Sequence, residues 1–144
     1  MKRKILIATH GKLASGFKDA LKIIIGDNEN ITVLNAFSQV ENPKDEIKSF
    51  LENLTKEDEL VVFTDLMGGS VNQMFMQYLH KYNMHLITGI NLPLLCQLML
   101  SENITEQVIL DSIEMAKTEI KYVNKEVEKQ MVENNQSCED VFLS

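Results

Sequence analysis

Residues 60–70 read LVVFTDLMGGS, and this stretch decides the fold. Its first half, residues 60–64, is an apolar, β-branched run that predicts a strand buried on both faces, as in a parallel sheet. Asp65 and the Gly68-Gly69 pair then predict a turn. Beyond the turn, apolar residues recur at the spacing of one helix face and predict an amphipathic helix. These residues are Val71, Met74, Phe75, Tyr78, Leu79 and Tyr82.

The same alternation of strand and helix extends to both sides of that stretch. Strands are expected at 5–8, 31–36, 60–64 and 85–89, and helices at 13–24, 43–54, 71–82 and 92–100. Asn42 is a typical N-cap and Pro43 a typical first helical residue, so they place the start of one helix. Strands that alternate with helices form βαβ units. The prediction is an α/β fold, an open and mainly parallel four-stranded sheet with helices on both faces.

The region after residue 100 predicts one long helix, which Thr105 caps. Its apolar stripe steps by 4, 3, 4, 3 and 4 residues through Ile109, Ile113, Ala116, Ile120, Val123 and Val127. Packing against the core explains such a stripe, and so does a heptad-like seam between two copies of the chain. Residues 130–144 show no clear periodicity. We therefore expect one domain over residues 1–130 and a C-terminal tail over residues 131–144.

The composition excludes several classes of protein. The chain has 144 residues, 14 Lys+Arg against 21 Asp+Glu, and a net charge of −7, which does not suit nucleic acid or an anionic membrane surface. A hydrophobic fraction of 44% excludes a disordered chain. Cys96 and Cys138 are too few for a disulfide framework. The apolar run at residues 5–8 is too short for a signal peptide, so we expect a cytoplasmic protein.

Polar residues follow the predicted strands, at the edge where parallel sheets bind ligands. His10 comes directly after the first strand and Asp65 directly after the third. A neutral imidazole is a good nucleophile, and a carboxylate that accepts a hydrogen bond from one ring nitrogen leaves the other free to attack. Gly68, Gly69 and Ser70 allow a phosphate to approach the backbone and a hydroxyl group. The set predicts phosphoryl transfer through His10, with no metal or organic cofactor required.

Other chemistries lack their parts in this sequence. The glycine motifs of P-loop and dinucleotide sites, the Gly-x-Ser-x-Gly of hydrolases and metal-type spacings of Cys and His do not occur. A response-regulator receiver needs an acidic pair after the first strand, where Ala8-Thr9-His10-Gly11 stands. We expect His80 and His85 to be surface or packing residues, and Lys12 to be a solvated residue of the first helical turn.

Three motifs carry a resemblance to a known family. They are Ile7-Ala8-Thr9-His10-Gly11, Phe63-Thr64-Asp65-Leu66-Met67-Gly68-Gly69-Ser70 and Thr88-Gly89-Ile90-Asn91-Leu92-Pro93-Leu94-Leu95. In this order and spacing they resemble the enzyme IIA component of the mannose family, which belongs to the bacterial phosphoenolpyruvate:sugar phosphotransferase system. One departure is Val71, where many members have Pro. The chain resembles a free-standing component, without the linker and fused IIB domain of some members.

The resemblance implies a phosphotransferase component with a phosphohistidine intermediate. His10 would accept a phosphoryl group on Nε2 from phospho-HPr and pass it to an enzyme IIB, while Asp65 hydrogen-bonds Nδ1. The membrane sugar permease would be an indirect partner. The residues expected beside the phosphate are Gly11, Gly68, Gly69 and Ser70. The family fold also exchanges a strand between the subunits of a homodimer, which would place a strand within residues 120–132, against the helix predicted there.

Two other functions stay open at this point. The phosphocarrier subunit of phosphoenolpyruvate-dependent dihydroxyacetone kinase has the same fold and histidine, although its first motif usually reads His-Ser and it lacks the Gly-Gly-Ser turn. A regulatory module would use phosphorylation of His10 only to switch the binding of a partner. The sugar cannot be read from this chain, because its selection is expected to lie in the membrane components.

Overall fold

The computed structural model describes the backbone of residues 2–38 and 42–143, and side chains as far as residue 135. The chain divides into two compact units, Met1–Leu100 and Ser101–Ser144. The side chain of Cys138, which we expected in a tail, lies outside the described part, as do residues 1 and 144. Within the described residues, no helix is both long and apolar enough to cross a membrane.

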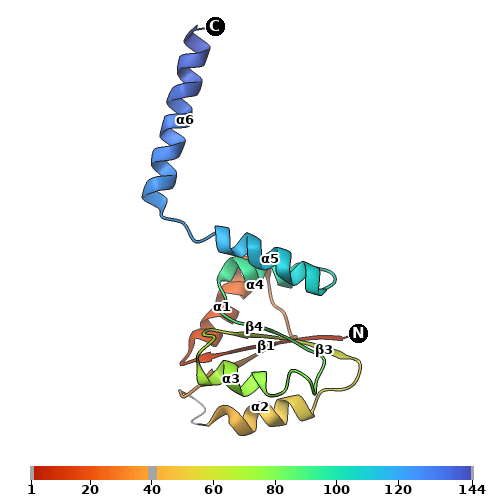
Figure 1. Cartoon of the computed structure of the whole chain (residues 1–144). Coiled ribbons are helices and arrows are strands. Elements are labelled where there is room, and N and C mark those ends of the chain that lie inside the picture. The colour runs from red at the N-terminus through yellow and green to blue at the C-terminus, as the bar shows by residue number, and fades with distance from the viewer. Residues whose placement is uncertain (1, 39–41, 144) are drawn as a thin grey trace. The chain divides into compact units, whose positions relative to one another are not determined.

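A parallel sheet forms the centre of the first unit (Figure 1). Its strands are β1 (Lys2–His10), β2 (Ile31–Ala36), β3 (Asp58–Thr64) and β4 (Met84–Ile87), in the order β2-β1-β3-β4. Each neighbouring pair of strands is parallel. Ala8 in β1 is level with Leu34 of β2 and with Thr64 of β3, so these strands end at one edge. The predicted four-stranded parallel sheet is confirmed.

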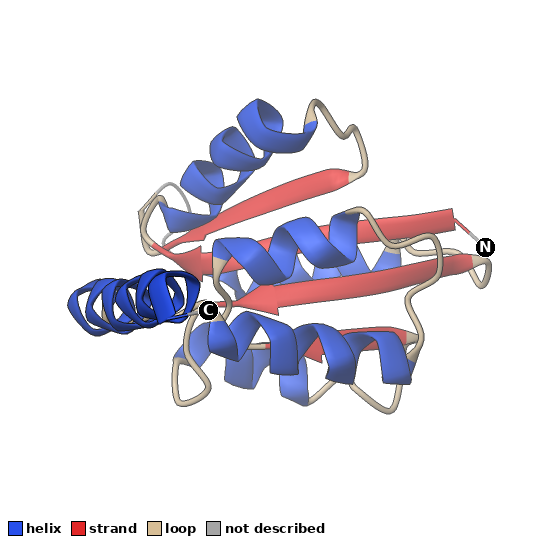
Figure 2. Ribbon diagram, turned by 90° about the horizontal axis from the view of Figure 1, so that it is seen from above, coloured by secondary structure: helices blue, strands red, loops and turns tan. Residues whose placement is uncertain are grey.

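Helices cover both faces of this sheet (Figure 2). They are α1 (Leu13–Ile25), α2 (Pro43–Glu52), α3 (Ser70–Met76) and α4 (Leu92–Met99). On one face, Ile47 of α2 and Phe75 of α3 share a core with Leu6 and Val62 of the sheet. Because side chains alternate along a strand, Ile7 faces the opposite side, where α1 and α4 contact each other. The core therefore has two layers of helices with the sheet between them.

Helix starts follow from capping residues in the sequence. Asn42 Oδ1 accepts the Lys44 N–H at 3.1 Å, and Pro43 is the first residue of α2, as predicted. Asn91 Oδ1 accepts the Leu94 N–H at 3.0 Å where α4 begins. Each cap satisfies a backbone donor that has no partner within its own helix.

The helix after residue 70 is shorter than predicted. The stripe from Val71 to Tyr82 predicts a continuous helix, but α3 ends at Met76. Tight turns follow, in which the Tyr78 N–H bonds the Phe75 carbonyl at 2.9 Å. Bonds from residue i to i−3 wind the chain more tightly than an α-helix does. Tyr78 and Tyr82 nevertheless pack against the core, so the apolar spacing reports their burial rather than a long helix.

The second unit contains two helices, α5 (Glu106–Thr118) and α6 (Val123–Leu143). The prediction of one continuous helix is wrong, because residues 119–122 belong to neither. Thr105 caps α5 as predicted, with Oγ1 3.1 Å from the Val108 nitrogen. At the other end, the Thr118 hydroxyl donates to the Met115 carbonyl at 2.6 Å. Such side-chain bonds to the backbone compete with helix continuation.

Residues 123–132 are helical, so the helix prediction holds there and the alternative of an exchanged strand is absent from this described segment. The sequence shows no periodicity beyond residue 130, yet α6 continues to Leu143, and the predicted boundary at 130 falls inside it. The apolar stripe is also divided. Ala116 in α5 is buried, whereas Val127 in α6 is 47% exposed. Burial therefore accounts only for the first part of that stripe.

Candidate active site

Two polar residues leave the sheet at the carboxyl ends of adjacent strands. His10 is the last residue of β1, and Asp65 directly follows β3. The register pairs Ala8 with Thr64, so both residues emerge at the same edge. In open parallel sheets this is the edge at which ligands bind.

The side chains of His10 and Asp65 are in direct contact. The Nδ1 atom of His10 lies 3.0 Å from Asp65 Oδ2. The same oxygen accepts the backbone N–H of His10 at 3.0 Å, and Oδ1 accepts the Leu66 N–H at 3.0 Å. Both carboxylate oxygens are therefore held by donors, while 39% of the His10 side chain stays exposed.

These contacts determine the charge of the carboxyl group and the tautomer of the ring. Partial burial raises the pKa of Asp65, but hydrogen bonds from the backbone and ring of His10 outweigh it and hold that pKa below its usual 3.8. An ionised carboxylate can only accept hydrogen bonds. Nδ1 of His10 must then carry a proton, so in the neutral imidazole the lone pair that can attack a reactant lies on Nε2.

The turn after Asp65 approaches the imidazole closely at one glycine. A Cβ atom at Gly69 would lie 2.9 Å from His10 Cε1 and 3.3 Å from the Leu66 carbonyl oxygen, so a side chain there requires a shift. A Cβ atom at Gly68 would meet nothing within 4 Å. Ser70, the exposed first residue of α3, follows directly. The predicted phosphate-binding turn therefore lies against the ring at Gly69.

Gly11 joins the loop after β1 to the end of β2. Its φ of +61° lies in the left-handed region that glycine adopts without strain. Its N–H donates to the Ala36 carbonyl at 2.8 Å. The Gly11 donor is therefore engaged within the protein, and any role beside a phosphate rests on its small size.

Threonines at the strand ends fasten the turn, and our reading of the sequence missed them. The Thr64 hydroxyl donates to Asn72 Oδ1 at 2.7 Å and lies 2.8 Å from Thr88 Oγ1. The Asn72 amide donates to the Met67 carbonyl at 3.2 Å, which ties the turn to α3. The recurrence of threonine at the ends of three predicted strands, with Thr9 as the third, is the signal that could have found them.

A second missed residue is Phe37, directly after β2. Its ring stacks on the His10 ring, with centroids 5.6 Å apart and planes 28° apart. Phe37 also has a φ of 63°, a conformation that costs a non-glycine residue about 1–3 kcal/mol. Its position after a strand that ends beside β1 is the only hint of this contact in the sequence.

The remaining histidines and the described cysteine lie away from this pair. His80 is exposed in the turns after α3. His85 lies in β4, where its Nε2 is 3.2 Å from Glu59 Oε1. Cys96 is a free thiol on α4. Among the residues that the structure describes, no group of three His, Cys, Asp or Glu side chains is placed to hold a metal ion.

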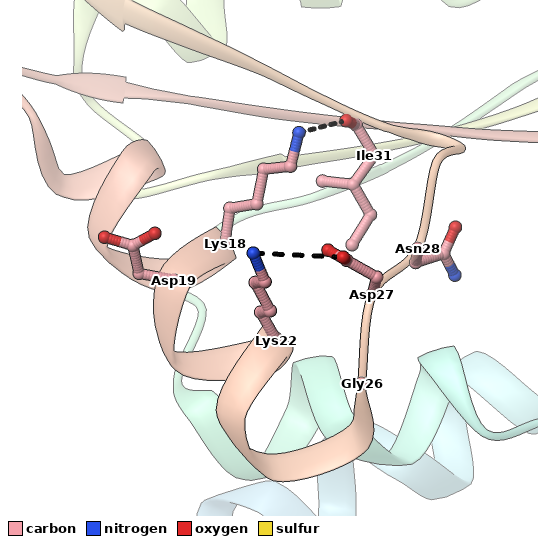
Figure 3. Close-up of a pocket in the computed structure, with 7 residues that line it drawn as sticks. All are labelled: Lys18, Asp19, Lys22, Gly26, Asp27, Asn28 and Ile31. Carbon is pink, nitrogen blue, oxygen red and sulfur yellow. Dashed lines mark hydrogen bonds and ion pairs between the residues drawn. The ribbon is translucent and has the colours of Figure 1, made fainter.

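A cavity of about 250 Å³ lies beside Ile31, the first residue of β2, and so at the amino ends of the strands (Figure 3). Lys18 lines it and donates from Nζ to the Ile31 carbonyl at 3.1 Å. Ile31 pairs with Ile5, which lies roughly 16 Å along β1 from His10 at the usual rise of a strand. The cavity is therefore separate from the pair of His10 and Asp65.

Comparison with known proteins identifies the family. The model of the EIIA-man family, described as the PTS system fructose IIA component, matches residues 4–117. The chain belongs to this family. As an EIIA-man member it is a IIA component of the PTS, the phosphoenolpyruvate-dependent sugar phosphotransferase system, and the predicted family is confirmed. Membership supports a phosphocarrier role in sugar transport and phosphotransferase activity.

Solved structures agree with the EIIA-man assignment. A Klebsiella pneumoniae protein assigned to a PTS permease is 34% identical, with a TM-score of 0.83 over 88% of this chain and 95% of its own. The PTS IIA protein associated with the fucose utilization operon of Streptococcus pneumoniae is 26% identical, with a TM-score of 0.75 over 88% and 97%. The mannose/sorbose specific IIA subunit of Enterococcus faecalis, 18% identical with a TM-score of 0.70 over 84% and 94%, shares the fold.

Replacement of Gly69 by Ala should displace the His10 ring. The φ of −75° at Gly69 suits alanine, but the added Cβ atom would lie 2.9 Å from His10 Cε1 and 3.3 Å from the Leu66 carbonyl oxygen, so the ring or the turn must shift. The contact between Nδ1 and Asp65 should weaken, which the ¹⁵N shifts of the two ring nitrogens report. Gly68→Ala is the matched control, because a Cβ atom there meets open space. Unchanged shifts in Gly69→Ala would contradict the close approach.

The stability contributed by Asp65 should depend on pH. Because its folded-state pKa lies below 3.8, the ionised carboxylate stabilises the fold above that pH, and the contribution is lost as pH falls through the lowered pKa. The free-energy gap between the wild type and Asp65→Asn in urea unfolding should therefore shrink on acidification below about pH 4. Asp27→Asn, at a carboxylate that is 73% exposed, should show a small gap throughout. A gap for Asp65→Asn that stays constant with pH would refute this account.

Proposed function

We propose that this EIIA-man protein is a phosphohistidine phosphocarrier that receives a phosphoryl group on His10 from phospho-HPr and passes it to an enzyme IIB. One observation carries the proposal. Asp65 Oδ2 lies 3.0 Å from Nδ1 of a ring that is 39% exposed, so the ring offers the Nε2 lone pair to a partner. The family membership supplies the context of sugar transport.

The chemistry is the transfer of a phosphoryl group from an atom of the donor protein to Nε2. The Nε2 lone pair of His10 attacks the phosphorus atom, and the bond from phosphorus to the donor atom breaks as its electron pair returns to the donor. The proton on Nδ1 stays in place, so the phosphorylated ring is cationic. The Asp65 carboxylate stabilises that cation, because a charge-assisted hydrogen bond is stronger than a neutral one. Transfer to the next protein reverses these steps.

The glycine-rich turn is the proposed cradle for the phosphoryl oxygens. Gly69 lies against the ring at Cε1. Gly68 and Ser70 flank it in the chain, so they are the neighbours expected for a group on Nε2. Absence of side chains at both glycines leaves room for three oxygens. Gly11 adds space on the side of the first loop.

Exposed apolar side chains near His10 support protein partners rather than a free sugar as reactant. They belong to the loops and the helix start that follow β1, β2 and β3, and they are Leu13, Phe37, Leu66 and Met67, which are 47%, 50%, 60% and 63% exposed. Exposed apolar patches are typical of protein interaction sites. HPr and IIB would use this patch in turn, because both must bring their reacting atom to the same nitrogen.

Homodimer formation belongs to the same proposal. Val123, Val127 and Met131 follow one another at intervals of four residues on α6 and are 63%, 47% and 60% exposed. Residues four apart share a helix face, so these side chains form one apolar stripe. A second copy of α6 is the partner that such a seam would suit.

Incubation with phosphoenolpyruvate, enzyme I and HPr should place an acid-labile phosphate on His10. The measurements are ³²P transfer, loss of the label on acid treatment, and mass-spectrometric mapping of a sample that has not been acid-treated. His10→Ala should abolish the label, and His80→Ala, at an exposed histidine in a turn, should retain it. Undiminished labelling of His10→Ala would refute the proposal. Onward transfer to the dihydroxyacetone kinase subunits instead of IIB would assign the chain to that pathway, and no onward transfer would favour a regulatory switch.

Asp65→Asn should slow phosphoryl transfer through His10 by about 10- to 100-fold, the range known for carboxylates that orient metal-bound histidine rings. The physical reason is loss of the charge that selects the Nδ1–H tautomer and stabilises the phosphorylated cation. Rapid-quench kinetics with purified phospho-HPr measure the rate, and circular dichroism checks the fold. Wild-type kinetics in this variant would remove Asp65 from the mechanism.

A further inference from the structure

An aromatic residue sits over the reacting ring in a conformation that its own backbone disfavours. Phe37 has a φ of 63°, and Phe37 is the non-glycine residue with positive φ among those that the structure describes. Its side chain is 50% exposed, so it adds less to the core than a buried phenylalanine would. Backbone strain at an exposed residue beside a reactive group is typical of a functional constraint.

The contact of Phe37 completes an enclosure around the imidazole. Asp65 binds Nδ1 at 3.0 Å, Gly69 lies beside Cε1, and the Phe37 ring stacks on the ring face at a centroid distance of 5.6 Å. The Phe37 loop is held near by the Gly11 bond to Ala36, the residue just before Phe37. Each of these contacts leaves Nε2 unused, so together they restrict the ring without blocking the proposed attacking atom.

We propose that Phe37 is a positioning residue for phosphoryl transfer through His10, an inference that rests on the proposed function. Its ring limits rotation of the imidazole and keeps Nε2 aimed outward. It also presents the electron-rich face of a benzene ring to an imidazole that becomes cationic once phosphorylated. Rings within about 6 Å of a cation attract it. Phe37 therefore favours the phosphorylated state more than the free one.

The competing explanation is that Phe37 only contacts the partner protein. That explanation accounts for its exposure but not for the stacking on His10 in the chain alone. The two explanations differ in the free protein. A positioning residue changes the state of the His10 ring before any partner binds, whereas a docking residue changes only the apparent affinity for the partner.

The test compares four variants of the full chain. Phe37→Ala removes the ring, Phe37→Leu keeps apolar bulk without a π-face, Phe37→Tyr restores an aromatic ring, and Phe37→Gly also relieves the backbone. Ile23→Ala, at an apolar side chain that is 86% exposed on α1, is the control. The readouts are the ¹⁵N shifts of the His10 ring nitrogens, the KM and kcat for transfer from phospho-HPr, and the half-life of the phosphorylated protein.

We expect Phe37→Ala and Phe37→Leu to lower kcat by about two- to five-fold. This factor corresponds to the stabilisation from a contact between an aromatic ring and a cation at an exposed site. The ring-nitrogen shifts should move toward a mixture of tautomers, and Phe37→Tyr should restore both readouts. Phe37→Gly should transfer phosphate as slowly as Phe37→Ala does. It should unfold at a higher urea concentration than Phe37→Ala, because glycine adopts a positive φ without backbone strain.

Unchanged ring-nitrogen shifts in Phe37→Ala, or a change in KM alone, would overturn the positioning role. Phe37 would then be a residue that only contacts the partner protein. A wild-type protein that phospho-HPr cannot label would instead refute the proposed function. The ring-nitrogen shifts do not require phosphorylation, so they still decide whether Phe37 orients the His10 ring in that case.

Discussion

In the centre of the sheet, β1 and β3 run parallel in a continuous register from Lys2 beside Asp58 to Ala8 beside Thr64. Every residue of this pair from Ile5 to Ala8 and from Leu60 to Thr64 is buried, so a slip of the register would expose apolar side chains on both faces at once. The register also sets where the two strands end. Because the pairing stops at Ala8 and Thr64, His10 and Asp65 lie just beyond it and come within hydrogen-bond distance of each other. The core and the site thus depend on the same pairing.

Polar groups at that edge form hydrogen bonds with one another. Thr9 accepts the Ala14 N–H at 2.7 Å, and the buried Thr64 and Asn72 bind each other at 2.7 Å. A buried polar group without a partner costs about 1–3 kcal/mol, so each bond constrains the loop that supplies it. Asp65 is held by three N–H groups, counting two on His10 and one on Leu66. The carboxylate is therefore already fixed in the position from which it orients the ring.

Sequence patterns predicted the elements whose signals are local. The strand at 31–36 and the caps Asn42 and Thr105 lie where propensity and capping chemistry place them. Apolar spacing mispredicted helix length where buried residues belong to turns or to two separate helices. Tyr78 and Tyr82 pack against the core from turns, and the stripe through Ile120 crosses a break between two helices. Periodicity reports which residues share a face, but not whether the backbone hydrogen bonds between them continue.

The sequence by itself determined the α/β alternation, and hence that His10 and Asp65 would lie at one edge of a parallel sheet, because strand direction fixes which ends are carboxyl ends. It also carried the three motifs that identify the EIIA-man family. Only the tertiary structure decided that Phe37 stacks on His10 and that Gly69 approaches the ring more closely than Gly68. Those contacts join loops that follow different strands. Their geometry depends on the register and twist of the whole sheet, which no local stretch of sequence encodes.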